Sequence, residues 1–201
     1  MPRRPKYFDP LSFQNFEGGM DPAERIQLAH DSAAALMKRF SESSDSLIGD
    51  RIIDYVKING VDDLVELWSS APARTLPGAL WRIAVIHRSI KSDPGLSAEA
   101  FRVGSENLQT IDEVLVGVES KATPEDIERI ADQILSGAFT GDLGDALLRA
   151  AGYCRVEAQG LSFLAVDEKQ SKEMLERATV LHDFSVELFA CAKLAHSQKL
   201  A

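Results

Sequence analysis

Cationic side chains interrupt an apolar stretch, Thr75 to Gly95, which reads TLPGALWRIAVIHRSIKSDPG. Arg82, His87 and Arg88 lie there among large apolar residues, and Trp81 precedes Arg82. On a helix that turns about 100° per residue, apolar side chains occupy both sides, so neither arginine has a wide solvent-facing side of its own. A charge in that position needs a carboxylate, carbonyl groups or a bound anion. Trp81, Arg82, His87 and Arg88 are therefore candidate residues for binding an anionic ligand.

The same stretch also allows a purely structural interpretation. Both arginines can pack their aliphatic stems on the core and form ion pairs with the surplus acids, while His87 is a hydrogen-bonded core histidine. His87 is in addition a candidate general acid or base, but no second catalytic group is tied to it by spacing. The sequence therefore predicts no catalytic residue.

Signatures of metal, phosphate or cofactor chemistry are absent from the sequence. Its four histidines never pair at helical spacing and no Glu-x-x-His occurs, so no metal site is predicted. No P-loop, Gly-x-Ser-x-Gly elbow or Gly-x-Gly-x-x-Gly fingerprint is present, so no cofactor is predicted either. Cys154 belongs to an apolar stripe, which predicts a buried and unreactive thiol.

Composition narrows the classes of partner. The chain has 201 residues, a formal net charge of −9 and 45% hydrophobic residues, which is typical of a globular, acidic protein. Such a charge repels phosphate backbones and disfavours nucleic acid, for which Arg3, Arg4 and Lys6 form the single local basic patch. No apolar run approaches the roughly 20 residues that cross a bilayer. With two cysteines and no signal-peptide pattern, we expect a cytoplasmic protein without membrane contact.

Helical spacing of apolar residues predicts an all-α fold. Asp21 and Thr123 are expected N-caps, each followed by proline, and Asn59-Gly60 is an expected helix end. We expect a bundle of about seven to eight helices in one domain, 21–201, with a soft boundary near 92–96. Gly104 interrupts one of the segments, and a strand is the alternative for 113–118. The expected helical segments are 21–40, 47–58, 61–69, 77–91, 97–108, 111–118, 123–139, 143–165 and 168–196.

Two regions are candidate contact surfaces. Residues 1–20 form an extended, aromatic-rich arm that packs either on its own domain or on a partner subunit. The last helix has an apolar stripe too wide for one neighbour, so it lies either centrally in the bundle or against another subunit. The candidate interface residues are Tyr7, Phe8, Phe13, Phe16, Phe184 and Leu188. These features predict a non-catalytic protein that binds other proteins, most simply as a homodimer; the alternative is a helical bundle, or an enzyme, with an anionic-ligand pocket near Trp81 to Arg88.

Two segments carry a resemblance to a known family. VDDLVELWSSAPARTLPGALWRIAVI (61–86) and EDIERIADQILSGAFTGDLGDALLRAAGYCRV (125–156) resemble a family of uncharacterised actinobacterial proteins of about this length. Some members are labelled as an RNA polymerase beta subunit, but a genuine beta subunit is several times longer and none of its active-centre sequence is recognisable in this chain. The resemblance implies no functional residues.

Overall fold

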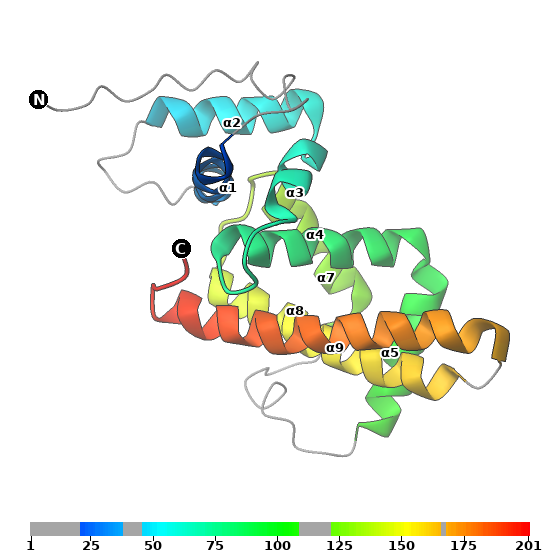
Figure 1. The fold of residues 1–201 in the computed structure, drawn as a ribbon. Coiled ribbons are helices and arrows are strands. Elements are labelled where there is room, and N and C mark those ends of the chain that lie inside the picture. Colours follow the sequence, from blue (N-terminus) through cyan, green and yellow to red (C-terminus); the bar gives the residue numbers. More distant parts are fainter. Residues whose placement is uncertain (1–20, 38–45, 109–121, 166–167) are drawn as a thin grey trace, which may run out of the picture.

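The computed structural model describes residues 21–37, 46–108, 122–165 and 168–201. These residues contain helices and turns but no β-strand, which confirms the predicted all-α fold (Figure 1). The predicted arm, 1–20, and the segment 111–118 lie outside the described residues. Within the described ranges the helices are α1 (Pro22–Leu36), α2 (Ser46–Asn59), α3 (Asp62–Trp68), α4 (Leu76–Ser92), α5 (Pro94–Asn107), α7 (Pro124–Leu135), α8 (Leu143–Leu164) and α9 (Glu168–His196).

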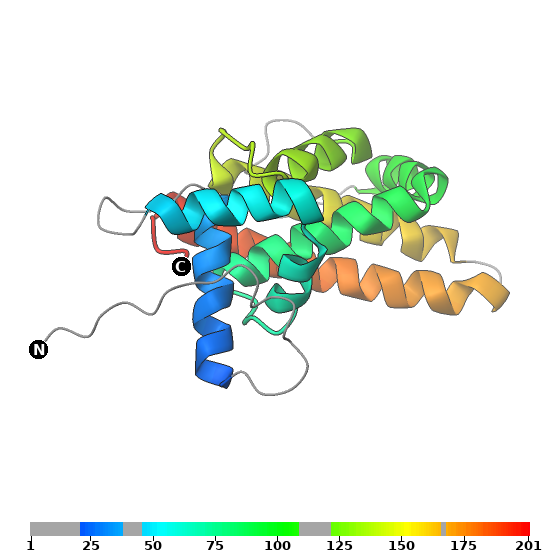
Figure 2. The ribbon, with the colours of Figure 1, turned by 90° about the horizontal axis from the view of Figure 1, so that it is seen from above.

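The two longest helices, α8 and α9, pack against each other in antiparallel directions (Figure 1). Helix α5 packs on α8, while α4 contacts both α7 and α9. Helices α1 and α2 cross steeply, as Figure 2 shows, and α1 also contacts α4. Buried apolar residues from all these helices form one continuous core. None of the described helices combines the length and the apolar character needed to cross a membrane.

Local capping explains where the helices begin. The side chain of Asp21 accepts a hydrogen bond from the Ala23 amide, and Thr123 forms a reciprocal capping box with Asp126. Both predicted N-caps are thereby confirmed. Asp93 ends α4 and caps α5, accepting a hydrogen bond from the Leu96 amide. The segment predicted as a soft boundary is thus a sharp corner between two helices.

Three predicted helix bounds were wrong. Helix α1 ends at Leu36, with Met37 as its C-cap, rather than at residue 40. Helix α5 begins at Pro94 rather than Ser97, because Asp93 supplies an N-cap and proline fits the first helical position. Gly104 does not interrupt this helix. Helix α7 ends at Leu135 rather than Phe139, because Gly137 takes the left-handed conformation, with φ +71°.

Two apolar residues that recur at helical spacing in the sequence lie at the surface. Ile26 of α1 and Val180 of α9 are both about half exposed. Helical spacing defines a stripe, but the neighbours available decide how much of it is covered. The centre of the α9 stripe, in contrast, is buried, including Leu181 and Leu188.

A buried polar cluster connects α5, α8 and α9. Arg177 donates to the carboxylate of Glu157 at 2.5 Å and to the Ser97 hydroxyl at 2.8 Å. Glu157 and Ser97 are almost fully buried, as is the neighbouring Tyr153. Burial raises the pKa of the Tyr153 phenol far above its ordinary value. This cluster lies inside the helix packing and is distinct from the pocket described next.

Candidate functional site

The four candidate residues of α4 form two pairs with different contacts. Arg82 lies about 140° around the helix from His87 and about 120° from Arg88. Trp81 and Arg82 contact α9, whereas His87 and Arg88 line a pocket that α4 forms with α2, α3 and α7. The structure therefore divides the predicted site into a packed half and an open half.

In the packed half, Arg82 is an internal ion-pair partner. Its Nε donates to Glu187 Oε2 at 2.5 Å and its Nη1 donates to the Gly78 carbonyl at 2.8 Å. The guanidinium lies 5.5 Å from the ring centroid of Trp81 and 5.3 Å from that of Phe184, within reach of cation–π attraction. Arg82 is only 8% exposed. For this residue the structural interpretation left open by the sequence is the supported one.

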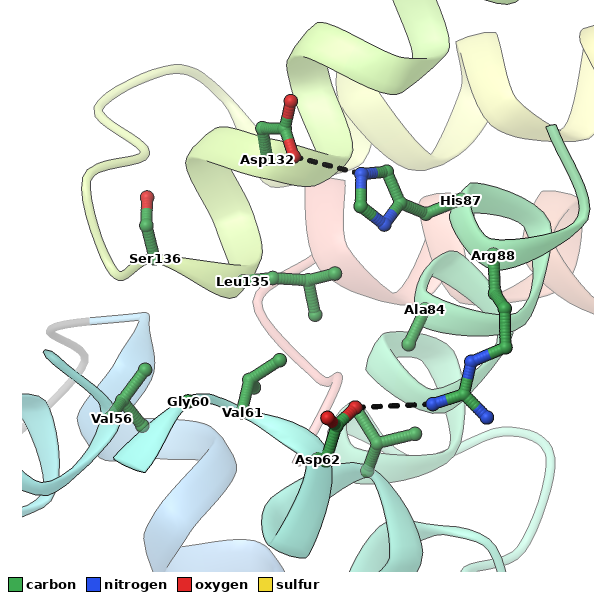
Figure 3. Close-up of a pocket in the computed structure, with 11 residues that line it drawn as sticks. Val56, Gly60, Val61, Asp62, Ala84, His87, Arg88, Asp132, Leu135 and Ser136 are labelled. Atoms are coloured by element: carbon green, nitrogen blue, oxygen red, sulfur yellow. Dashed lines mark hydrogen bonds and ion pairs between the residues drawn. The ribbon is translucent and has the colours of Figure 1, made fainter. Parts of the chain in front are cut away.

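The open half is a pocket of about 340 Å³ between the end of α2, α3, α4 and α7 (Figure 3). The left-handed Gly60, with φ +86°, ends α2 and turns the chain into α3, which places Val61 and Asp62 at the pocket. This confirms the predicted helix end at Asn59-Gly60. The apolar residues that line the pocket are Val56, Val61, Val65, Ala84 and Leu135.

His87 and Arg88 each have an acidic neighbour at the pocket. His87 Nε2 lies 2.8 Å from Asp132 Oδ1, and Arg88 Nη2 donates to Asp62 Oδ1 at 3.1 Å (Figure 3). The Arg88 and Asp62 side chains are 72% and 84% exposed, so the expectation that Arg88 has no wide solvent-facing side was wrong. Their ion pair contributes only about 0–1 kcal/mol. This pair can open at little cost, which leaves Arg88 available to another anion.

A group of charged side chains beside the pocket was not predicted. Glu128 and Asp132, one turn apart on α7, face His87 and Lys91, one turn apart on α4. Lys91 Nζ lies 3.3 Å from Asp132 Oδ1 and 3.7 Å from Glu128 Oε1. The spacing of residues within one helix does not reveal this group, because its members are divided between α4 and α7. The available signal was the i, i+4 spacing of two carboxylates on the polar side of a strongly amphipathic helix.

Tyr55 fixes the α2–α3 corner beside the pocket. Its hydroxyl donates to the Asp63 carboxylate, and this hydrogen bond, with burial and the nearby charge, raises the pKa of Tyr55 to about 12. The phenol therefore keeps its proton at neutral pH. The corner that carries Asp62 is held by a contact independent of Arg88.

The structure describes two of the six candidate interface residues. Phe184 packs edge-on against Trp81, with ring centroids 5.7 Å apart, and Leu188 is completely buried. Both side chains are thus occupied by contacts within the chain. Tyr7, Phe8, Phe13 and Phe16 lie outside the described residues.

Comparisons with known proteins give no match: no protein-family model, no curated protein and no solved structure matches this chain. The resemblance of segments 61–86 and 125–156 to an actinobacterial family stays a prediction. A role for the pocket follows from its geometry and chemistry alone.

Proposed function

We propose that this chain binds a small organic anion, with a carboxylate or phosphate beside an apolar body, in the pocket between α2, α3, α4 and α7. The observation that carries this proposal is the position of His87 and Arg88 at the edge of an apolar pocket. A volume of about 340 Å³ falls within the range of small-molecule sites, roughly 300–1,000 Å³. An apolar floor with a few polar groups at its edge is the usual composition of such sites.

Arg88 would hold the anionic group. A guanidinium has five N–H donors, and its hydrogen bond to Asp62 uses one nitrogen. A ligand carboxylate or phosphate can form two parallel hydrogen bonds with this planar group. The ligand would therefore bind Arg88 more strongly than Asp62 does through its one exposed hydrogen bond. The apolar body of the ligand would then cover Ala84 and Leu135.

Binding, rather than catalysis, is the role we propose. His87 paired with Asp132 resembles a base held by a carboxylate, but a nucleophile would have to lie within about 3 Å of the imidazole. Ser136, the hydroxyl residue of the pocket, donates instead to the Gln133 carbonyl at 3.2 Å. The described residues therefore assemble no nucleophile with this base.

The test is thermal unfolding in EDTA with inorganic phosphate, butyrate, hexanoate or benzoate. We expect at least one compound to raise Tm of the wild type, since a ligand at 100 times its Kd stabilises the native state by about 2.7 kcal/mol. Arg88→Met should abolish the rise. Arg102→Met should retain it, because Arg102 is a similarly exposed, acid-paired arginine on α5. No rise with any compound, or an equal rise in Arg88→Met, would contradict the proposal.

Protein binding, the first hypothesis from the sequence, is our second proposal, together with a cytoplasmic location and a homodimer. It is favoured by half-exposed apolar side chains on α9, the helix predicted as a contact surface: Leu175, Val180 and Val186. Light scattering on the full chain and on a variant without residues 1–20 would test it. A strict monomer in both cases would remove the homodimer.

A further inference from the structure

Three side chains with metal-binding atoms converge at one edge of the pocket. A ring nitrogen of His87 and carboxylate oxygens of Glu128 and Asp132 all lie within 4.8 Å of one another. His87 comes from α4, and the two acids come from successive turns of α7. Figure 3 shows the imidazole of His87 directed at Asp132 beside the pocket.

From this geometry we propose that His87, Glu128 and Asp132 bind a divalent transition metal, for which Zn²⁺ is the probe. One imidazole nitrogen and two carboxylate oxygens are ligands that Zn²⁺ accepts at about 2.0–2.2 Å. Imidazole favours transition metals, while Ca²⁺ and Mg²⁺ prefer sites made of oxygen alone. Three protein ligands leave a fourth position of a tetrahedral ion, and the adjoining pocket gives room for a water molecule or an anion there.

Lys91 is the group that a metal would replace. Two carboxylates one turn apart repel each other, and the ammonium of Lys91 contacts both of them. This side chain is 49% exposed, so it can turn into solvent when an ion binds. Its ion pairs are surface contacts, each contributing about 0–1 kcal/mol, far less than a metal bound by three ligands. Lys91 therefore acts as a competitor of the ion.

A second group of similar composition provides a matched control. His196 Nε2 lies 3.0 Å from Asp145 Oδ1 and 3.4 Å from Asp142 Oδ1. These three side chains are exposed, and Asp142 already caps α8 by accepting from the Asp145 amide. The two groups offer the same kinds of ligand atoms, but only the first lies at the described pocket. A nonspecific surface ion would bind both alike.

The experiment is calorimetric titration of tag-free, metal-free chain with ZnCl₂, repeated with CoCl₂ to record the visible absorption of a tetrahedral ion. We expect one principal site, weakened about 10-fold or more by His87→Gln, Glu128→Gln or Asp132→Asn. His196→Gln should leave its affinity unchanged. Lys91→Met should raise the affinity several-fold, because it removes the competing ammonium. Circular dichroism should show that each variant keeps its helix content.

The outcomes separate metal binding from a simple ion-pair network. If the network only joins α4 to α7, Asp132→Asn lowers Tm but the wild type binds no Zn²⁺. No binding, binding lost in His196→Gln, or an unchanged affinity in Lys91→Met would each overturn the inference. It does not rest on the proposed function, since this titration contains no organic ligand and the ligand screen contains EDTA.

Discussion

Gly104 of α5 and Gly160 of α8 face each other where the two helices cross. A Cβ atom built on Gly160 would lie 1.7 Å from the Ala100 carbonyl oxygen, and one on Gly104 would lie 1.9 Å from the Val156 carbonyl oxygen. Any side chain at either position would overlap the backbone of the other helix. The close approach of α5 to α8 therefore depends on both glycines.

Gly104→Ala and Gly160→Ala should each lower the free energy of unfolding by about 1–3 kcal/mol, or more, because backbone atoms cannot turn aside as a side chain can. Gly95→Ala is the control on α5, since the nearest atom to its added Cβ is a side-chain oxygen at 3.7 Å. We expect that variant to be unchanged or stabilised by up to about 1 kcal/mol. Urea unfolding followed by circular dichroism measures the free energy of unfolding of all three variants. Equal stabilities would show that the helices can separate without cost.

The Arg82–Glu187 pair should contribute to stability rather than to ligand binding. Arg82→Met keeps the aliphatic stem but leaves the partly buried Glu187 without its cation, so we expect a loss of about 1–3 kcal/mol. Glu187→Gln should cost less, because an amide oxygen still accepts a hydrogen bond. Both variants should bind any pocket ligand as the wild type does. If Arg82→Met kept its stability but no longer showed a ligand-induced rise in Tm, Arg82 would have to be part of the binding site.

Local signals predicted the helix caps well. Thr123 and Asp126 lie three residues apart and satisfy one another, so their capping box is fully encoded in a short segment. The left-handed Gly60 is a local feature of the same kind. In contrast, Gly104 looked like an interruption, because its role depends on Val156, which is distant in sequence.

The site was only half predictable for the same reason. Helical spacing shows that Arg82 points away from His87 and Arg88, but it does not show which helix each side chain meets. Arg82 finds its acid 105 positions later, and His87 finds Asp132 45 positions later. These pairings are set by the packing of α4 between α7 and α9, which no short segment encodes.

The Asp126 cap should make stability fall in acid. The Thr123 amide, and then Arg129, stabilise the carboxylate and hold the pKa of Asp126 below its ordinary value. A lowered folded-state pKa adds stability above the ordinary carboxyl pKa, and this stability disappears as pH falls through the folded-state value. Asp126→Ala should therefore cost up to about 1 kcal/mol at pH 7, a modest figure because the side chain is partly exposed.

The pH dependence of the unfolding free energy tests the predicted role of Asp126. The difference in unfolding free energy between wild type and Asp126→Ala should shrink as pH is lowered below about 4, where the carboxyl of the unfolded chain becomes protonated, and disappear as pH falls through the lowered folded-state value. Urea titrations at a series of pH values measure it. Glu125→Ala is the neighbouring control, since its acidic side chain is exposed and makes no part of the capping box. A difference that stays constant down to the lowest pH would contradict the capping role.

Both cysteines should be inert in the native state. Burial raises the pKa of the Cys154 thiol well above its ordinary value and that of Cys191 to about 11. The thiolate is the reactive form, and at pH 8 a thiol of pKa about 11 is ionised only to about 0.1%. Cys191 also donates to the Ala73 carbonyl at 3.3 Å, which ties α9 to the segment before α4. Attack therefore requires the helices to open.

An aromatic disulfide reagent at pH 8 should thus label neither thiol rapidly until denaturant unfolds the chain, when both react. Cys154→Ala and Cys191→Ala assign each reaction, and circular dichroism reports whether labelling precedes unfolding. Because Cys191 lies at the α9 face that covers α4, its labelling rate measures how often this contact separates. Rapid labelling of Cys191 in a fully helical sample would show that the end of α9 is not packed in the core. The contact between Arg82 and Glu187 of α9 would then be in doubt as well.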